Sequence, residues 1–108
     1  MKTTTDNCPV ETTLQLIGSK WKVLIIRELL SGTKRFGLLF KGIDGISQKM
    51  LTQQLRQMEK DRLINRKVYA QVPPKVEYSL TKRGRSLESV LEAMRQWGEQ
   101  YAPNECNL

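Results

Sequence analysis

Apolar residues recur every three or four positions over the first half of the chain, the spacing of helices that bury one face. Pro9 suits the first position of a helix and Gly18 suits a helix end, so one helix is predicted between them. Ser19 and Ser47 belong to the residue types that cap helix N-termini, and each precedes a run with helical spacing. The pattern predicts helices over about 9–17, 20–31, 36–40 and 48–61, separated by short links.

After residue 62 the pattern changes from helical spacing to alternation, which is typical of β-strands with one buried face. We expect one strand over about 63–69 and another over 75–80. The segment 70–74 ends in two prolines and should project as a hairpin tip, because proline lacks the N–H that a strand ladder needs. Helical spacing then returns and predicts one continuous helix from Lys82 to Tyr101, with Gly84 tolerated in its first turn.

The order of these elements predicts the fold class. Four short helices, a two-stranded hairpin and a long last helix make a mostly α fold with a small β-hairpin, the layout of a winged helix-turn-helix. A short extended link at 33–35 separates the second helix from the third. A chain of 108 residues is enough for one domain. We expect residues 1–108 to form that domain, with its core at about 8–80 and a dimerisation helix at about 81–101.

The positive charge of the chain is concentrated in its middle. The formal net charge is +7, but residues 33–85 alone contain 13 Lys and Arg against four Asp and Glu. Such a concentration is the electrostatic footprint of a protein that binds a polyanion. A solvated basic surface without a partner would have the same composition, so charge alone leaves both interpretations open.

The helix predicted at 48–61 has two different faces. Leu51, Leu55 and Met58 share the face that should pack on the core. On the other face, Arg and Lys suit guanine edges or phosphates, Gln suits adenine, and Thr suits a phosphate or a thymine methyl group. An ordinary amphipathic helix could also have a polar face, but the helical turn before it and the basic hairpin after it favour a DNA recognition helix. The candidate recognition residues are Ser47, Gln48, Lys49, Thr52, Gln53 and Arg56.

The hairpin and three other groups supply further basic residues. Arg66 and Lys67 lie on one strand, Lys75 lies on the other and Gln71 lies at the tip, so the hairpin could follow the DNA backbone or enter the minor groove. Charges also keep an exposed edge strand soluble, which is the alternative explanation. Other candidate phosphate contacts are Lys20, Lys34, Arg35 and the group Lys82, Arg83 and Arg85. The last group opposes the dipole at a helix N-terminus, a small cost that phosphate contact would explain.

The last helix carries an apolar seam that is longer than one small core needs. Its members are Leu87, Val90, Leu91, Met94, Trp97 and Tyr101. A second copy of the chain could cover part of the seam, and a two-fold dimer would place two recognition helices in successive major grooves about 34 Å apart. The alternative is that the whole seam packs on its own domain.

The sequence offers little for catalysis, metal binding or membrane insertion. It contains no His and only two Cys, Cys8 and Cys106, which lie near opposite ends. Neither a metal cluster nor a nucleophile with an adjacent base is visible. No apolar run approaches the roughly 20 residues that span a bilayer. We therefore expect a cytoplasmic protein without a cofactor, a metal, a membrane partner or enzymatic activity.

Six stretches spread over residues 8–98 carry a resemblance to a known family. The two longest are Ile46–Arg56 and Val72–Thr81, and the others are Cys8–Glu11, Ile17–Lys22, Lys34–Phe36 and Trp97–Gly98. With these stretches the chain resembles the HxlR-type bacterial transcriptional regulators, a winged-helix group akin to the MarR-like proteins. The resemblance implies a dimer formed through terminal helices. It also implies that Ser47–Arg56 reads an inverted repeat with wing support from residues 67–75, but it implies no particular effector.

Several members of that family sense electrophiles or oxidants through a cysteine at the position of Cys8. A helix N-terminus lowers the pKa of a thiol and makes it more reactive, whereas the nearby Asp6 and Glu11 act in the opposite direction. A small residue that only caps or packs the helix start is the alternative. A disulfide between Cys8 of one subunit and Cys106 of another is conceivable.

Together these observations predict a sequence-specific regulator of transcription that binds double-stranded DNA as a homodimer. They leave open whether it responds to a small-molecule or redox effector. The alternative is a structural protein that binds nucleic acid without sequence preference. Such a protein would need basic groups only, so the Gln and Thr residues on the recognition face argue against it.

Overall fold

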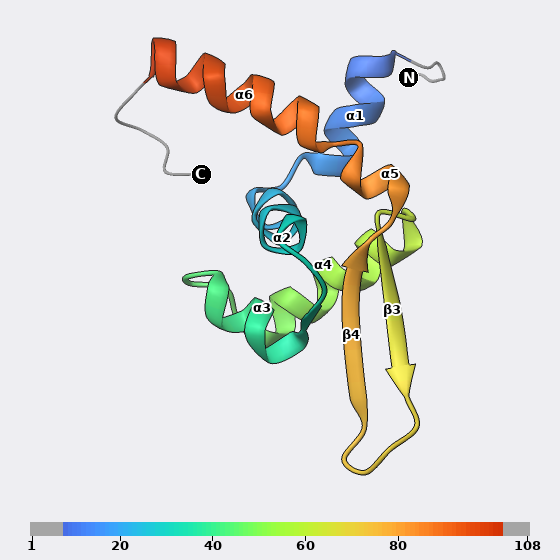
Figure 1. The fold of residues 1–108 in the computed structure, drawn as a ribbon. Helices are drawn as coiled ribbons and strands as arrows, with labels where there is room; N and C mark the ends of the chain where they lie inside the picture. The colour runs from blue at the N-terminus through green and yellow to red at the C-terminus, as the bar shows by residue number, and fades with distance from the viewer. Residues whose placement is uncertain (1–7, 103–108) are drawn as a thin grey trace.

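The computed structural model describes residues 8–102, which form helices at both ends and a small sheet between them. The elements are α1 (Pro9–Ile17), α2 (Lys20–Leu30), β2 (Lys34–Arg35), α3 (Phe36–Gly42), α4 (Gln48–Lys60), β3 (Ile64–Tyr69), β4 (Lys75–Leu80), α5 (Lys82–Arg85) and α6 (Glu88–Tyr101). The predicted mostly α fold is confirmed: α3 and α4 form the helix-turn-helix, and β3 and β4 form a wing that projects from the helices (Figure 1). Every helix within residues 8–102 is too short or too polar to cross a bilayer.

Side-chain caps start α2 and α4 at the predicted places. The Ser19 hydroxyl accepts hydrogen bonds from the backbone N–H groups of Trp21 and Lys22, at 3.1 and 3.3 Å. The Ser47 hydroxyl accepts one from the N–H of Met50 at 3.0 Å, where α4 begins. Each cap satisfies N–H groups that have no partner within the helix, so local sequence is enough to fix these boundaries.

The sheet contains one strand more than the predicted hairpin. All neighbouring strands are antiparallel, in the order β2-β4-β3. The hairpin has the predicted strands, with Ile64 opposite Leu80 at its base and Tyr69 opposite Lys75 near its tip. The expected extended link at 33–35 contains β2, where Arg35 lies opposite Glu77. This pairing joins the start of the helix-turn-helix to the wing.

One apolar core holds the helices and the base of the wing together. The predicted inner face of α4 is confirmed, because Leu51, Leu55 and Met58 are all buried. Ile25 and Leu29 of α2 are completely buried in the same core. Burial of each such side chain stabilises the fold by about 1.5–3 kcal/mol. Since only one face of α4 is covered, the opposite face is left to solvent.

The prediction of one continuous last helix is wrong. The helix is interrupted after Arg85, and α6 begins only at Glu88. At the break the Ser86 hydroxyl donates to the Arg83 carbonyl, and the Leu87 N–H bonds the Gly84 carbonyl three residues back instead of four. The tighter turn directs Leu87 into the core, while α6 continues across the end of the molecule opposite the wing (Figure 1).

Gly84 is required at its position, which corrects the expectation that it is merely tolerated. It is buried, and a Cβ built on it would overlap the carbonyl oxygen of Leu63. The same carbonyl accepts a hydrogen bond from the Thr81 N–H at 3.0 Å, so it cannot move away freely. The close approach of α5 to the start of β3 therefore depends on the missing side chain.

Replacing Gly84 with Ala should lower the free energy of unfolding by about 1–3 kcal/mol, the usual cost of overpacking a tight contact. Urea unfolding followed by circular dichroism measures this change. Gly37→Ala is the matched control, because a Cβ at that helical position meets nothing within 4 Å. The control should be neutral or stabilising by up to about 1 kcal/mol. Equal stability of Gly84→Ala and the wild type would contradict the account of this contact.

Candidate nucleic-acid interface

The outward face of α4 collects polar side chains in one open hollow. Its volume is about 360 Å³, and Phe36 of α3 borders it. Thr52 is half-buried, whereas the longer side chains around it are exposed. The α4 residues that line the hollow are Gln48, Lys49, Thr52, Gln53 and Arg56. The structure therefore brings together five of the six candidate recognition residues, and we name this surface the recognition face.

The sixth candidate, Ser47, lies at the N-cap of α4, where its hydroxyl binds the Met50 N–H. The start of α2 lies next to α4, because the Ser19 hydroxyl is 3.5 Å from Oε1 of Gln54. Lys20 follows directly, is exposed, and holds its Nζ 4.7 Å from the centre of the Trp21 ring. These contacts place Lys20 on the α2 side of α4.

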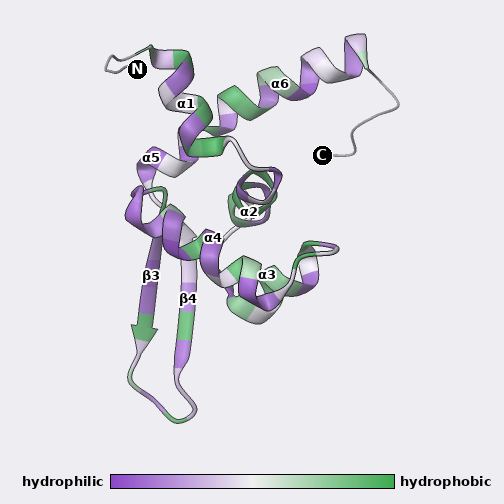
Figure 2. Cartoon of the chain, turned by 180° about the vertical axis from the view of Figure 1, so that it is seen from behind, coloured by the Kyte–Doolittle hydropathy of each residue, from purple (hydrophilic) through white to green (hydrophobic). Residues whose placement is uncertain are grey.

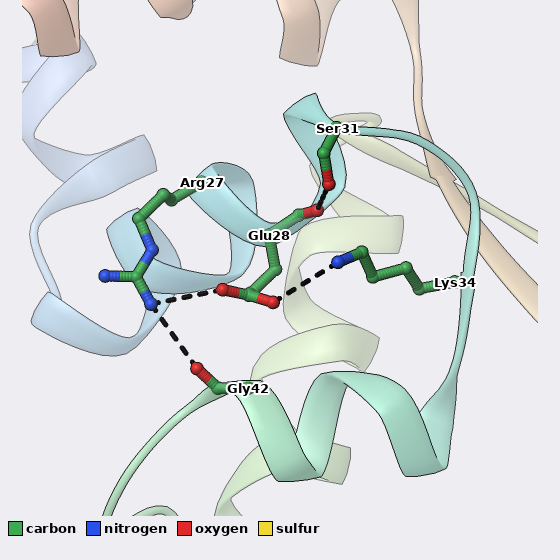
Figure 3. Close-up of polar contacts among 5 residues, drawn as sticks. All are labelled: Arg27, Glu28, Ser31, Lys34 and Gly42. Atoms are coloured by element: carbon green, nitrogen blue, oxygen red, sulfur yellow. Dashed lines mark hydrogen bonds and ion pairs between the residues drawn. The ribbon is translucent and has the colours of Figure 1, made fainter.

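Ion pairs around Glu28 connect α2 to β2, and a hydrogen bond from Arg27 connects α2 to α3 (Figure 3). The Glu28 carboxylate lies 3.1 Å from the Arg27 guanidinium and 3.4 Å from the Lys34 ammonium group. Arg27 also donates to the carbonyl oxygen of Gly42 at 3.4 Å, at the end of α3. A Cβ on Gly42 would overlap the Glu28 carboxylate, so glycine permits this approach. Lys34, a candidate phosphate contact, is thus paired with an acid and placed to hold β2 and α3 in position.

The wing holds two of its basic residues, Lys67 and Lys75, around one tyrosine. The Nζ atoms of Lys67 and Lys75 lie 4.9 and 4.6 Å from the centre of the Tyr69 ring. The Tyr69 hydroxyl donates to the Glu77 carboxylate at 2.9 Å, and Lys75 forms an ion pair with it at 3.4 Å.

The hydrogen bond from Tyr69, followed by the effects of Lys75 and Arg35, lowers the pKa of Glu77, and desolvation opposes them. The carboxylate therefore stays ionised at neutral pH and orders the cations. The pairing of Lys75 and Glu77 on alternate positions of β4 could have been recognised from the sequence, but the contact with Tyr69 needs the hairpin register.

The tip of the wing projects as predicted and has no charged side chain. Gln71 is exposed, and Val72 is 99% exposed, the largest value among the exposed apolar side chains of residues 8–102. The tip lies at the end of the molecule opposite α6 (Figure 1). Any contact through the tip must therefore use the Gln71 amide and the Val72 side chain, because Lys67 and Lys75 lie on the strands and not at the tip.

The apolar seam of the last helix divides into two parts. Leu87 is buried, and Val90 and Leu91 pack against the core of the same chain. In the second part more than half of each side chain is exposed, and its members are Met94, Trp97 and Tyr101. The rings of Trp97 and Tyr101 contact each other, with centroids 4.9 Å apart.

A second exposed apolar surface lies on α1, where Val10 and Leu14 are also more than half exposed. Figure 2 shows α1 and α6 together at the end of the molecule opposite the wing, with hydrophobic residues on both. The helical spacing of Val10 and Leu14 is visible in the sequence, but their exposure is not, so α1 was missing from the candidate dimerisation residues. We name the exposed apolar residues of α1 and α6 the terminal face.

Cys8 lies at the N-cap of α1 and is an exposed free thiol. Among residues 8–102 no side chain caps this helix, in contrast to α2 and α4. Cys106, the other candidate half of a disulfide, lies outside the described residues.

Comparison with known proteins identifies relatives along most of the chain. The family model described as HxlR-like helix-turn-helix matches residues 16–106. The uncharacterised HTH-type transcriptional regulator YdeP of Bacillus subtilis is 55% identical over 96 residues, which cover 89% of this chain and 75% of YdeP.

Two solved structures of regulators share the fold. The redox regulator HypR in its oxidised form is 50% identical, with a TM-score of 0.79 over 86% of this chain and 96% of the HypR chain. The reduced form of the transcriptional regulator YodB from B. subtilis is 38% identical, with a TM-score of 0.80 over 89% of this chain and 95% of the YodB chain. The chain is therefore similar to transcriptional regulators in both sequence and fold.

Proposed function

The chain belongs to the HxlR-like helix-turn-helix family of DNA-binding transcriptional regulators, and on this premise we propose that it binds an inverted-repeat operator as a homodimer. The recognition face of α4 is the observation that carries this proposal. It is exposed, it lies in one hollow, and it is fixed from behind by the core. A helix presented in this way can enter the major groove.

The residue types of the recognition face favour reading of bases over contact with phosphates alone. Gln48 and Gln53 can each form two hydrogen bonds with adenine, and Arg56 can do the same with guanine. Thr52 offers a methyl group to thymine. A protein that recognised only the backbone would gain more from basic residues at the two glutamine positions.

The wing supports this contact from the side. Lys67 and Lys75 on the wing, with Arg35 on the neighbouring β2, supply cations for the phosphate backbone, and Gln71 at the tip can reach the minor groove. Because Tyr69 and Glu77 already order Lys75, less side-chain freedom is lost when that lysine binds DNA.

Sequence-specific binding is tested by fluorescence anisotropy on the duplex upstream of the gene, with unlabelled random duplex as competitor at fixed salt. We expect tight binding that survives a large excess of random DNA. Gln53→Ala should weaken operator binding by about 1–3 kcal/mol and change binding to random DNA little. Gln57→Ala, one turn further along α4 and outside the recognition face, is the matched control. The protein would be a non-specific binder if random DNA competed as strongly as this duplex does. The same comparison applies to duplexes selected from random libraries.

The terminal face is proposed to form the two-fold interface. Its apolar side chains belong to α1 and α6, and the chain's own core leaves them uncovered. A second copy that packs on this face would extend the core and place both recognition helices on the opposite side of the dimer.

Sedimentation equilibrium at micromolar concentration should therefore give a dimeric mass. Leu14→Ser should weaken the dimer about 100-fold, because the residue occurs twice in a two-fold interface and each copy contributes about 1.5 kcal/mol or more. Leu38→Ser on α3 is the control, since Leu38 is 57% exposed and Leu14 is 56% exposed. A monomeric mass of the wild-type protein would contradict the proposal.

Cys8 is proposed as a redox-responsive residue. It is exposed at the start of α1, beside the terminal face. One structural relative is described as a redox regulator, and another has been determined in a reduced form. A covalent change at this position would act on the proposed dimer interface and so on the spacing of the recognition helices.

The test measures operator affinity before and after mild diamide oxidation, in the wild type and in Cys8→Ser. We expect oxidation to change the affinity of the wild type and to leave Cys8→Ser unaffected. An identical response of the two proteins would remove Cys8 from the mechanism.

A further inference from the structure

A second concentration of positive charge lies away from the recognition face. Four basic side chains, Arg62, Arg66, Lys82 and Arg83, line an open hollow of about 480 Å³, together with the single acid Glu59. We name it the basic hollow. It lies where the C-terminal end of α4, the start of β3 and α5 meet, at the root of the wing (Figure 1).

The backbone around the basic hollow is fixed although its residues are far apart in the sequence. The Thr81 hydroxyl donates to the carbonyl oxygens of Arg62 and Leu63, at 2.7 and 3.1 Å. The same hydroxyl accepts a hydrogen bond from the Gly84 N–H at 2.9 Å. These bonds hold the start of α5 against the end of the α4–β3 turn, so the basic residues of both segments face one space.

The cations of the basic hollow have no acidic partners within the described part of the chain. Arg62, Arg66 and Arg83 are exposed, and neither they nor Lys82 form an ion pair or a side-chain hydrogen bond within residues 8–102. Lys34 and Lys75, in contrast, are each paired with a glutamate. Four like charges around one acid repel one another, and Lys82 and Arg83 also oppose the dipole of the helical turn they begin. An anion in the hollow would relieve both effects.

We propose that the basic hollow binds phosphate groups of the DNA strand that borders the major groove entered by α4. A helix of 13 residues is about 20 Å long, whereas the major groove is about 12 Å wide. Since recognition helices contact bases mainly with their N-terminal residues, the C-terminal end of α4 should lie at the rim of the groove, where the phosphates are. Guanidinium groups match phosphate oxygens with paired hydrogen bonds. This inference rests on the proposed function, because that function supplies DNA as the ligand. It adds a phosphate contact outside the recognition face and the wing tip.

The salt dependence of binding tests this contact. Arg66→Gln and Arg83→Gln remove charge from the hollow without removing bulk. Each variant should reduce the steepness of log K against log salt by about 1, and the double variant by about 2. The loss should be the same on operator and on random duplex, because phosphates carry no sequence information. Lys41→Gln is the control, since it removes one exposed charge from α3, outside the hollow and the candidate DNA contacts, and should leave the slope unchanged.

A phosphate group could also come from a free anion, so a second measurement separates the two sources. Thermal unfolding is compared in inorganic phosphate and in chloride at equal ionic strength, without DNA. We expect the same small effect of phosphate on the wild type and the double variant. If the double variant has the same salt slope as the wild type, the proposal is overturned. If inorganic phosphate then stabilises only the wild type, the hollow binds a free anion instead. Because the slopes are also measured on random duplex, the result stands even if no operator preference is found.

Discussion

Burial of one face of α4 is the interaction on which the rest of the structure depends. Leu51, Leu55 and Met58 fix the helix against α2 and the base of the wing, and in doing so they fix which residues remain outside. The recognition face owes its composition to this burial. If the helix were rotated about its axis, the leucines would be exposed and the glutamines would be buried. The caps at Ser19 and Ser47 then set where the two contacting helices begin.

The charged residues of the molecule divide into two groups with different roles. Glu28 pairs with Arg27 of its own helix and with Lys34 of β2. Glu77 pairs with Lys75 of its own strand and accepts a hydrogen bond from Tyr69 of β3, and together these contacts position β2 and the wing. Such partly exposed pairs contribute little stability each, at most about 1 kcal/mol, so positioning is the better explanation for them. The cations of the recognition face and of the basic hollow are left without acidic partners among residues 8–102, and they are assigned to DNA together with Lys75, which Glu77 orders.

The elements whose signals are local could be predicted from the sequence. Helical spacing and alternation located α1 to α4 and the hairpin, and the cap residues located the starts of α2 and α4. The polar residues opposite the buried face of α4 were grouped correctly for the same reason.

Features that depend on contacts between distant segments were not predictable. The need for glycine at position 84 follows from packing against Leu63, about twenty residues earlier in the chain, and the break between α5 and α6 accompanies burial of Leu87 in the core. The pairing of β2 with β4, the Glu28 ion pairs and the exposure of α1 likewise arise only when the chain is folded.

In the proposed complex, one dimer presents two copies of the recognition face to successive major grooves of the same DNA. The most direct test is operator affinity as a function of the distance between the two half-sites. The account predicts tight binding at the native spacing and its loss when about half a helical turn of DNA is inserted, because the second half-site then faces away. Affinity that does not depend on the spacing, or that is equal on a single half-site, would contradict it.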